Sequence, residues 1–271
     1  MGSKLAERNV VITGASSGIG KASAVAAAAE GACVLLLARR APELDEVVQE
    51  IRAAGGTAHG YQCDVTDPDS VDKTVKAILG EHGHVDMLVN NAGRSIRRAL
   101  HRSTDRLHDY ERTMAVNYFG ALRMIMALLP SMRERRFGHV VNISSAGVQL
   151  ATPRYSAYLA SKAALDKFTE VAAAETLADG ITFTTVHMPL VKTPMIAPST
   201  GYNAGPTYSV EWAAAQVVKA MVKRPKRVDT VHGAAAEYWG MVTPKIKDRI
   251  MHQFYRRYPD SPAAKGEIPT P

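Results

Sequence analysis

Two side chains with acid–base chemistry stand four residues apart in the middle of the chain. Tyr158 and Lys162 fall in a predicted helical segment, Tyr155–Asp179, and residues four apart project from the same face of a helix. A phenol with its ordinary pKa of about 10 is a poor acid–base group at pH 7, whereas a neighbouring ammonium stabilises the phenolate and lowers that pKa. The spacing predicts a tyrosine tuned for proton transfer, although an exposed pair has the same spacing. Tyr155 is a poorer candidate, because Leu159 stands where its lysine would be.

A glycine-rich turn lies near the N-terminus. It follows the first predicted strand, Asn9–Ile12, and a helical pattern starts directly after it. Glycines allow a sharp turn and a close approach of the backbone to a diphosphate, which the free N–H groups at the helix N-terminus stabilise. We expect a dinucleotide to contact Gly14, Ser16, Ser17, Gly18, Ile19 and Gly20.

The residues after the second predicted strand bear on which dinucleotide binds. Enzymes that prefer NAD usually carry a carboxylate here for the ribose 2′-hydroxyl, but Cys33–Leu37 is followed by Arg39 and Arg40. Because guanidiniums bind phosphate oxygens in a fork, the pair favours NADP(H); the alternative is a solvated arginine pair. Asp64, with its neighbour Val65, is expected to accept from the adenine amino group, or else Asp64 caps the next helix.

Further polar motifs follow in order along the chain. Asn90-Asn91-Ala92-Gly93 comes after the fourth predicted strand, and Asn117 lies inside a long helical stretch. Val141-Asn142-Ile143-Ser144-Ser145 ends the fifth strand, ahead of Tyr158. With the glycine turn and the Tyr–Lys pair, these motifs make the chain similar to the short-chain dehydrogenase/reductase family over nearly its whole length.

That resemblance implies roles for individual residues. The implied catalytic set is Tyr158 as proton donor, Lys162 binding the nicotinamide ribose and tuning Tyr158, Ser145 hydrogen-bonding the substrate oxygen, and Asn117 holding a water in a proton relay. Around the adenosine ribose, the implied wall consists of Asn90, Asn91 and the backbone of Ala92 and Gly93, with Asn90 also stabilising the central strand.

One segment departs from the family pattern. The family usually has Pro-Gly after the sixth strand, whereas this chain has Pro189 followed by Leu190. A leucine lacks the conformational freedom of glycine, which leaves the local backbone path open. By resemblance, Pro189, Val191 and Thr193 still contact the cofactor, with Val191 and Thr193 holding the nicotinamide carboxamide.

Short apolar runs alternate with longer helical patterns, which predicts a doubly wound parallel sheet with helices on both faces. The expected fold is a single-domain α/β Rossmann fold over residues 1–232, with a C-terminal helical extension and tail over residues 233–271 that belongs to the same domain. The predicted strands are Asn9–Ile12, Cys33–Leu37, Ala58–Gln62, Met87–Val89, His139–Ile143 and Ile181–Val186.

Composition narrows the setting. Cys33 and Cys63 have no CxxC partner and no histidine at metal-ligand spacing in the sequence, so we expect core thiols and no metal. No secretory leader and no apolar run of about 18 residues is evident, which predicts a cytoplasmic protein. The net charge is +7, and residues 218–257 alone hold ten Lys/Arg against three Asp/Glu. Since no nucleic-acid-binding motif accompanies this charge, we expect no nucleic-acid partner.

A narrower resemblance concerns the substrate. The stretches Arg94–Arg98, His108–Asn117 and His187–Ile196 resemble the reductase domain of bacterial fatty acyl-CoA reductases and related acyl-aldehyde reductases. We expect NADPH-dependent reduction of a long-chain or otherwise apolar aldehyde or ketone, with an apolar substrate loop formed by Met188, Leu190, Met195 and Ile196 unless these only pack the core. Without a second nucleotide-binding module, the chain is expected to act on the aldehyde and not on acyl-CoA. The alternatives are an NADP-linked alcohol or hydroxysteroid dehydrogenase and, more remotely, a non-catalytic NADP(H)-binding sensor or scaffold.

The C-terminal region suggests further partners. Val242, Ile246, Ile250, Phe254 and Tyr258 recur every four residues among basic side chains, which is typical of an amphipathic helix. Such a helix packs on its own domain or on a partner subunit, or makes weak peripheral contact with the inner membrane. By resemblance we expect a homodimer or homotetramer, with the helices around Asn117 and Lys162 at an interface.

Overall fold

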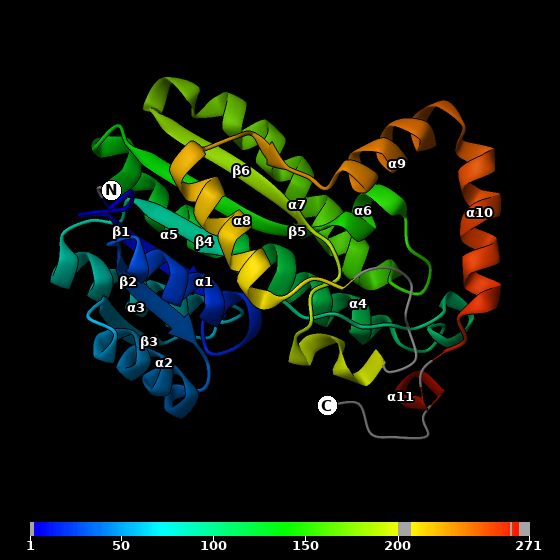
Figure 1. Ribbon diagram of the computed structural model, residues 1–271, viewed down its shortest axis with the longest axis horizontal. Coiled ribbons are helices and arrows are strands. Elements are labelled where there is room, and N and C mark those ends of the chain that lie inside the picture. The colour runs from blue at the N-terminus through cyan, green and yellow to red at the C-terminus, as the bar shows by residue number, and fades with distance from the viewer. Residues whose placement is uncertain (1–2, 200–206, 261, 266–271) are drawn as a thin grey trace.

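Seven parallel strands form the centre of the molecule in a computed structural model, which describes residues 3–199, 207–260 and 262–265. The order β3-β2-β1-β4-β5-β6-β7 is that of a doubly wound sheet (Figure 1). All six predicted strands are confirmed, and a two-residue seventh strand, too short for a recognisable pattern, is added. The bounds are β1 Asn9–Thr13, β2 Cys33–Ala38, β3 Thr57–Gln62, β4 Met87–Asn90, β5 Gly138–Ser145, β6 Ile181–Met188 and β7 Arg227–Val228.

Helices cover both faces of this sheet (Figure 1). One face packs against α1 Gly18–Ala29, α2 Ala41–Ala53 and α8 Val210–Lys223. The other packs against α3 Pro68–His82, α5 Ala121–Glu134 and α7 Ser156–Glu175, with α4 Leu107–Met114 beside α7. Successive strand residues serve opposite faces, so Val10 and Val11 belong to different core clusters, and the strands are apolar without alternation.

The order in which the chain adds strands to the sheet changes direction between β1 and β4. From β1 the strands lead outward to β2 and β3 on one side, and from β4 to β5, β6 and β7 on the other. In an open parallel sheet, ligands bind in the crevice outside the carboxyl ends of the strands at such a switch point. The glycine turn, Arg39, Asn91 and Ser145 stand at or directly after strand ends at this edge, whereas Asn117 and Tyr158 come from helices.

One helix passes a length and composition test for a membrane span that the sequence was not expected to meet. It is the continuous helical stretch Leu107–Glu134. Within its most apolar 18 residues, 39% are buried inside the protein. Met124, Ile125 and Leu128 belong to the core cluster beneath the sheet. This stretch is therefore a covering helix of the fold.

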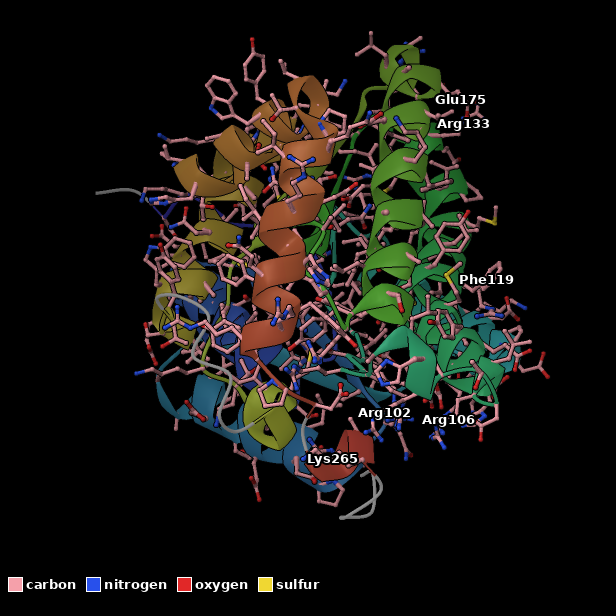
Figure 2. All side chains as sticks on the ribbon, turned by 90° about the vertical axis from the view of Figure 1, so that its right-hand side faces the viewer. Arg102, Arg106, Phe119, Arg133, Glu175 and Lys265 are labelled. Atoms are coloured by element: carbon pink, nitrogen blue, oxygen red, sulfur yellow. The ribbon has the colours of Figure 1, made fainter. Side chains whose placement is uncertain are left out.

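The C-terminal extension consists of α9 Val231–Val242, α10 Pro244–Arg257 and α11 Pro262–Lys265 (Figures 1 and 2). Two predictions about it need correction. The predicted boundary after residue 232 falls inside α9, and the single helix expected through Val242 is broken at Thr243, because Pro244 starts a new helix.

The extension is fastened to its own domain by polar contacts. Arg154 donates to the carboxylate of Asp260 over 2.8 Å and to the carbonyl of Tyr255 over 2.9 Å. Arg98 donates to the carbonyl of Ala264. The apolar stripe of α10 remains largely open, with Ile250 46% exposed.

Candidate active site

The glycine turn has the conformation that its sequence predicts. Gly14 and Gly18 adopt φ values of +66° and +55°, which side chains disfavour. A Cβ at Gly20 would lie 2.3 Å from the carbonyl oxygen of Gly14. The turn therefore requires glycine at these three positions and leads directly into the N-terminus of α1, whose N-cap residue is Ser17.

A neighbouring loop braces this turn from the side of β4. The side chain of Asn91 donates to the carbonyl oxygens of Thr13 and Gly14 over 3.0 and 3.3 Å. The backbone N–H groups of Asn91 and Ala92 both donate to the Thr13 hydroxyl over 3.0 Å. Asn90 points elsewhere: it is buried and donates to Asn142, which ties β4 to β5.

The arginine pair after β2 faces solvent beside the turn. The side chains of Arg39 and Arg40 are 71% and 57% exposed. Arg40 donates to the Ser16 hydroxyl over 3.3 Å, so it lies next to the glycine turn. Its carboxylate partner, Glu43, is on the following helix and is exposed enough to give way to a phosphate.

Asp64 does not cap the following helix. That cap is Asp67, whose side chain accepts from Asp69. Asp64 accepts from the backbone and hydroxyl of Thr66 and lies 4.0 Å from Arg39. The expected contact of Asp64 with the adenine stays a prediction, and its buried neighbour Val65 packs against Gly120.

The hydroxyl groups of Ser145 and Tyr158 meet at the carboxyl end of β5. Ser145 ends β5 and caps the short helix α6 Ala146–Leu150 by accepting from Gly147 over 3.1 Å. Tyr158 stands in the first turn of α7, and its side chain is hydrogen-bonded to that of Ser145. Tyr155 packs edge-on against the Tyr158 ring. The structure therefore brings together the predicted serine and tyrosine, and the poorer candidate, Tyr155, is not part of this pair.

The pKa of Tyr158 departs from the sequence-based expectation. Burial raises it to about 12, the hydrogen bond with Ser145 opposes that rise, and the charge of Asp166 adds to it. The Lys162 amine, expected to lower the pKa, donates instead to the carbonyl of Ile143 over 2.6 Å. Burial lowers the pKa of Lys162 itself to about 8. In the protein without cofactor, Tyr158 is thus a neutral phenol at pH 7 and Lys162 is mostly charged.

Asn117 lies in a π-helical segment, Ala115–Gly120, between α4 and α5. π-Helical turns are rare in proteins, and those that occur often lie at functional sites. The Asn117 side chain donates to Ser161 over 2.9 Å and exchanges hydrogen bonds with the backbone of Arg94. A Cβ at Gly93 would lie 3.2 Å from the oxygen of Asn117 and 3.7 Å from the amine of Lys162. Gly93 therefore leaves open the space that these two side chains flank.

Leu190 resolves the question left by the missing glycine. Its φ is not positive, so no left-handed backbone is needed there. Its carbonyl accepts from the N–H of Tyr208 over 2.8 Å, and Val191 forms a bridge with the same residue. Thr193 comes close to Gly18, where a Cβ would approach it to 3.3 Å. The segment after β6 thus reaches the glycine turn without the family's usual residue.

A buried histidine behind the catalytic helix was not predicted. Nε2 of His187 lies 2.9 Å from Asp166 and Nδ1 lies 2.7 Å from Asp229. Because carboxylates only accept hydrogen bonds, both ring nitrogens carry protons and the ring is an imidazolium. Asp166, one helical turn after Lys162, also accepts from Ser144. Only the position of the three residues in the fold unites them, so no local sequence signal could have found the cluster.

The substrate side is only partly as expected. Met188 is buried in the core cluster on the α1 face, so its role is packing. Met195 is 45% exposed, and Ile196 is half-buried. A cavity of about 340 Å³ lies beside the end of β6, lined in part by Pro189, Tyr208 and Trp212.

Taken together, these groups can bind a dinucleotide along the carboxyl edge of β1, β2 and β4 and can protonate an oxygen held between Ser145 and Tyr158. Residues 8–202 match the family described as short chain dehydrogenase. The protein therefore belongs to the short-chain dehydrogenase/reductase family, as the sequence motifs indicated, and is an oxidoreductase.

Relatives extend this assignment over almost the whole chain. A fatty acyl-CoA reductase of Acinetobacter baylyi is 50% identical over 257 residues, which are 95% of this chain and 87% of that protein. An uncharacterized oxidoreductase of Mycobacterium tuberculosis is 49% identical over 95% of this chain and 76% of its own length. A fatty acyl-CoA reductase from the same species is 40% identical over 92% of this chain and 85% of its own.

Solved structures support the fold. A short-chain dehydrogenase from Streptomyces avermitilis has a TM-score of 0.74 and 31% identity over 92% of this chain and 98% of that one. A short-chain type dehydrogenase/reductase from Mycobacterium marinum has a TM-score of 0.77 and 28% identity over 83% of this chain and 93% of that one. The predicted single-domain Rossmann fold is confirmed.

Proposed function

We propose that the protein uses NADPH to reduce a long-chain or otherwise apolar carbonyl compound to the alcohol. The observation that carries this proposal is the pairing of the Ser145 and Tyr158 side chains at the carboxyl end of β5. The likeness to two fatty acyl-CoA reductases supports a substrate with a long alkyl chain. A protein that only sensed the cofactor would not need this proton-donating pair.

The residues around the turn fit a nicotinamide dinucleotide. A Cβ at Gly14 or Gly20 would collide with the backbone of Ala92 or of Gly14, so only glycines allow this tight turn. The turn leads into the N-terminus of α1, where free N–H groups can bind a diphosphate. A bound nicotinamide dinucleotide supplies the hydride for the reduction. Arg39 and Arg40 favour a ribose 2′-phosphate. Each has a nearby carboxylate, Asp64 at 4.0 Å from Arg39 and Glu43 at 2.8 Å from Arg40.

Proton transfer follows from the positions of the side chains. Ser145 hydrogen-bonds the carbonyl oxygen of the substrate, and Tyr158, neutral at pH 7, donates a proton to the oxygen as negative charge develops there. Lys162 is held by Ile143 next to Gly93 and binds the ribose hydroxyls. Asn117 joins the loop at Arg94 to Ser161 of α7 by hydrogen bonds. In this position it holds the water of the proton relay.

The substrate loop supports an apolar ligand. Leu190, Met195 and Ile196 stand between the end of β6 and α8, and a flexible thioether adapts to alkyl chains. The chain spans 87% of a relative named for acyl-CoA reduction. An acyl-CoA thioester is therefore a second candidate substrate, and the test compares it directly with the aldehyde.

Assembly and location complete the proposal. We expect a homo-oligomer formed through α5, α7 and the π-helical segment before α5, where Met126, Val171 and Phe119 (Figure 2) are 60%, 50% and 45% exposed. We also expect a cytoplasmic protein whose α10 touches the membrane surface only weakly, through Ile250 and Phe254.

The test is a substrate panel measured with NADPH and with NADH. Long-chain aldehydes are expected to be reduced faster than small ketones, steroids and acyl-CoA thioesters, and NADPH is expected to be preferred. The double variant Arg39→Ser/Arg40→Ser should lose about 10- to 100-fold in kcat/KM with NADPH, because hydrogen bonds to charged groups are worth about 1.5–3 kcal/mol. Its kcat/KM with NADH serves as the internal control and should barely change. A wild-type preference for NADH, or for steroids, would overturn the proposal.

A further inference from the structure

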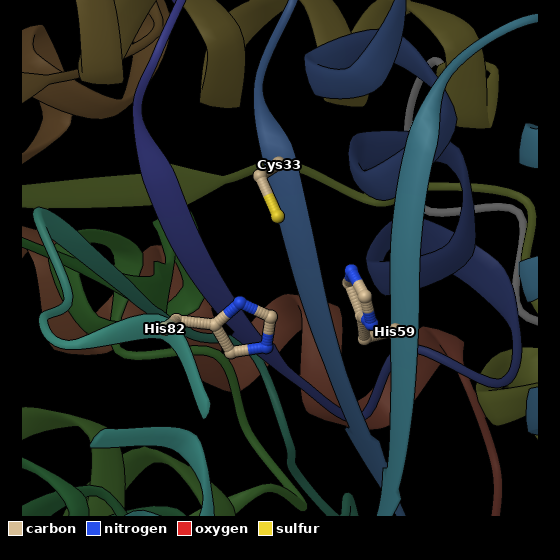
Figure 3. Close-up of side chains that lie close together, drawn as sticks. All are labelled: Cys33, His59 and His82. Atoms are coloured by element: carbon tan, nitrogen blue, oxygen red, sulfur yellow. The ribbon is translucent and has the colours of Figure 1, made fainter. Parts of the chain in front are cut away.

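Three metal-binding side chains converge at the edge of the sheet opposite the catalytic groups. They are Cys33 of β2, His59 of β3 and His82 at the end of α3 (Figure 3). One possible ligand atom from each lies within 4.8 Å of the other two. We propose that these three residues bind a divalent transition metal of the zinc class.

The parallel register brings the ligands together. Cys33 pairs with Thr57, so His59 lies two residues further along β3 and on the same face of the sheet. The third element, α3, packs on that face and ends at His82, after which Gly83 turns the chain with a φ of +74°. In Figure 3, the sulfur and both imidazole rings face a common space. All three side chains are half-buried, so an ion has access from solvent.

The donor set suits zinc. One thiolate and two imidazoles are typical ligands of Zn²⁺, which binds them at about 2.0–2.3 Å. Around a tetrahedral ion such ligands lie about 3.5 Å apart, so separations of up to 4.8 Å close by small side-chain rotations. Thiolate and neutral imidazole are the forms that bind the ion, so metal binding releases the thiol proton of Cys33.

Neighbouring polar groups orient His82. Its Nε2 lies 2.8 Å from the hydroxyl of Tyr61, which donates to Glu81 over 2.6 Å. Metal-binding histidines usually have their second nitrogen held in this way. Nδ1 of His82 is then the nitrogen left for the ion. The fourth position is open to water, since the Glu81 carboxylate lies 3.9 Å from Nε2, on the side of the ring that faces Tyr61.

The location argues for a structural role. Cys33 is the first residue of β2, whereas Arg39 follows the last one, so the two lie at opposite ends of the strand. An ion at Cys33 would join β2, β3 and α3 without reaching Tyr158. We therefore expect the metal to raise thermal stability and to leave turnover unchanged.

Cobalt reports on this site directly. The full chain, stripped with chelator and kept reduced, is titrated with Co²⁺. The expected result is one ion per chain, with the near-ultraviolet charge-transfer band of a cobalt thiolate and the visible bands of tetrahedral Co²⁺. Saturating Zn²⁺ should displace the cobalt and raise the melting temperature by about 5 °C or more.

The chain offers a matched control, since it has two cysteines. Cys33→Ser should abolish the charge-transfer band and the thermal shift, whereas Cys63→Ser should keep both, because buried Cys63 lies outside the cluster. His59→Gln should weaken Co²⁺ binding while carbonyl reduction stays at the wild-type rate, which shows that the fold is intact. No thiolate band in the wild type, or binding that persists in Cys33→Ser, would overturn the proposal and assign the metal to other histidines.

Discussion

The nucleotide end of the molecule and its C-terminal extension are held in place by different kinds of interaction. At the nucleotide end, the backbone determines the shape: Gly14 and Gly18 have positive φ, and Asn91 donates to main-chain oxygens of the turn. In the extension, α10 and α11 are fastened by arginine side chains, while much of the apolar surface of α10 stays open. The first region is a rigid part of the sheet, and the second is attached to it at a few points.

This difference separates two kinds of contribution to function. The groups proposed to transfer the proton are anchored to β5 and α7, both packed into the core. Leu190, which replaces the family's usual glycine, lies in the segment after β6, and the extension lies on the surface of the domain. Variants in the first region should therefore change the chemical step, and variants in the second should change stability or substrate affinity.

The largest effect is expected from Tyr158→Phe. Removing the hydroxyl that pairs with Ser145 should lower kcat by about 10³-fold, within the range found for general acids. NADPH binding, followed by fluorescence titration, should be unchanged, because the phenyl ring keeps the packing of α7. Turnover is measured as the loss of NADPH absorbance with a long-chain aldehyde.

Tyr155→Phe is the matched control on the same segment. Tyr155 packs edge-on against Tyr158 with ring centroids 6.3 Å apart. This variant should keep kcat within about twofold, because a substitution away from the reacting atoms changes little. Equal losses in the two variants would mean that the segment, and not the hydroxyl of residue 158, carries the activity.

The two regions also differ in how much of them could be predicted. Strand positions, the turn and the Ser145–Tyr158 pair were predictable, because local patterns specify strands and parallel strands end at one edge. The expected lowering of the Tyr158 pKa is not seen in the chain alone, because burial raises that pKa. Only the fold shows that the Lys162 amine turns to the carbonyl of Ile143. The break at Pro244 was missed because a four-residue apolar repeat was followed across it.

Clusters that join distant segments could not be predicted at all. His187 meets Asp166 and Asp229 only after β6 has packed against α7, and Cys33 meets its histidines only through the register of β2 and β3. A single sequence contains no signal for such pairings. The same holds for the contact between Arg154 and Asp260, which lie 106 positions apart.

A smaller but clear effect is expected at His187, which lies between the two regions. His187→Gln removes the cation that separates two carboxylates, and breaking such a buried pair costs about 3 kcal/mol of unfolding free energy. Burial alone would lower the pKa of His187, but the hydrogen bonds and charges of Asp166 and Asp229 raise it above the ordinary value. A raised histidine pKa stabilises the fold fully below the unfolded value of about 6.5, and the contribution is lost as the pH rises through the folded value.

Urea unfolding across the neutral and alkaline range tests this. The unfolding free energy of the wild type should fall as the pH rises above about 6.5, and His187→Gln should show a flatter profile. His108→Gln is the control, because His108 also lies beside a carboxylate, Asp109, but is 46% exposed and should change stability by less than about 0.5 kcal/mol. A profile in His187→Gln that parallels the wild type would mean that the imidazolium is not what joins β6 to α7.

The smallest effect is expected from Asp260→Asn, in the segment between α10 and α11. The Arg154 and Asp260 side chains are both 7% exposed and lie 2.8 Å apart, but Arg154 also keeps its bond to Tyr255 and its stacking on that ring. Asp260 also lies 3.2 Å from Arg102, so both of its oxygens face arginines. Asparagine keeps an oxygen that can accept from Arg154, so the loss should stay at about 1.5 kcal/mol, the value of one charge-assisted hydrogen bond. Hydrogen exchange should quicken in α10 and α11 and stay unchanged in β5, and kcat should be kept while KM for a long-chain aldehyde rises. Asp248→Asn, an exposed change on α10 itself, should leave hydrogen exchange, kcat and KM unaltered.

If Asp260→Asn lowers kcat instead, then the extension positions the catalytic groups through Arg154. Arg154 has a φ of +71° and directly precedes Tyr155 and α7, so the two regions would then act as one.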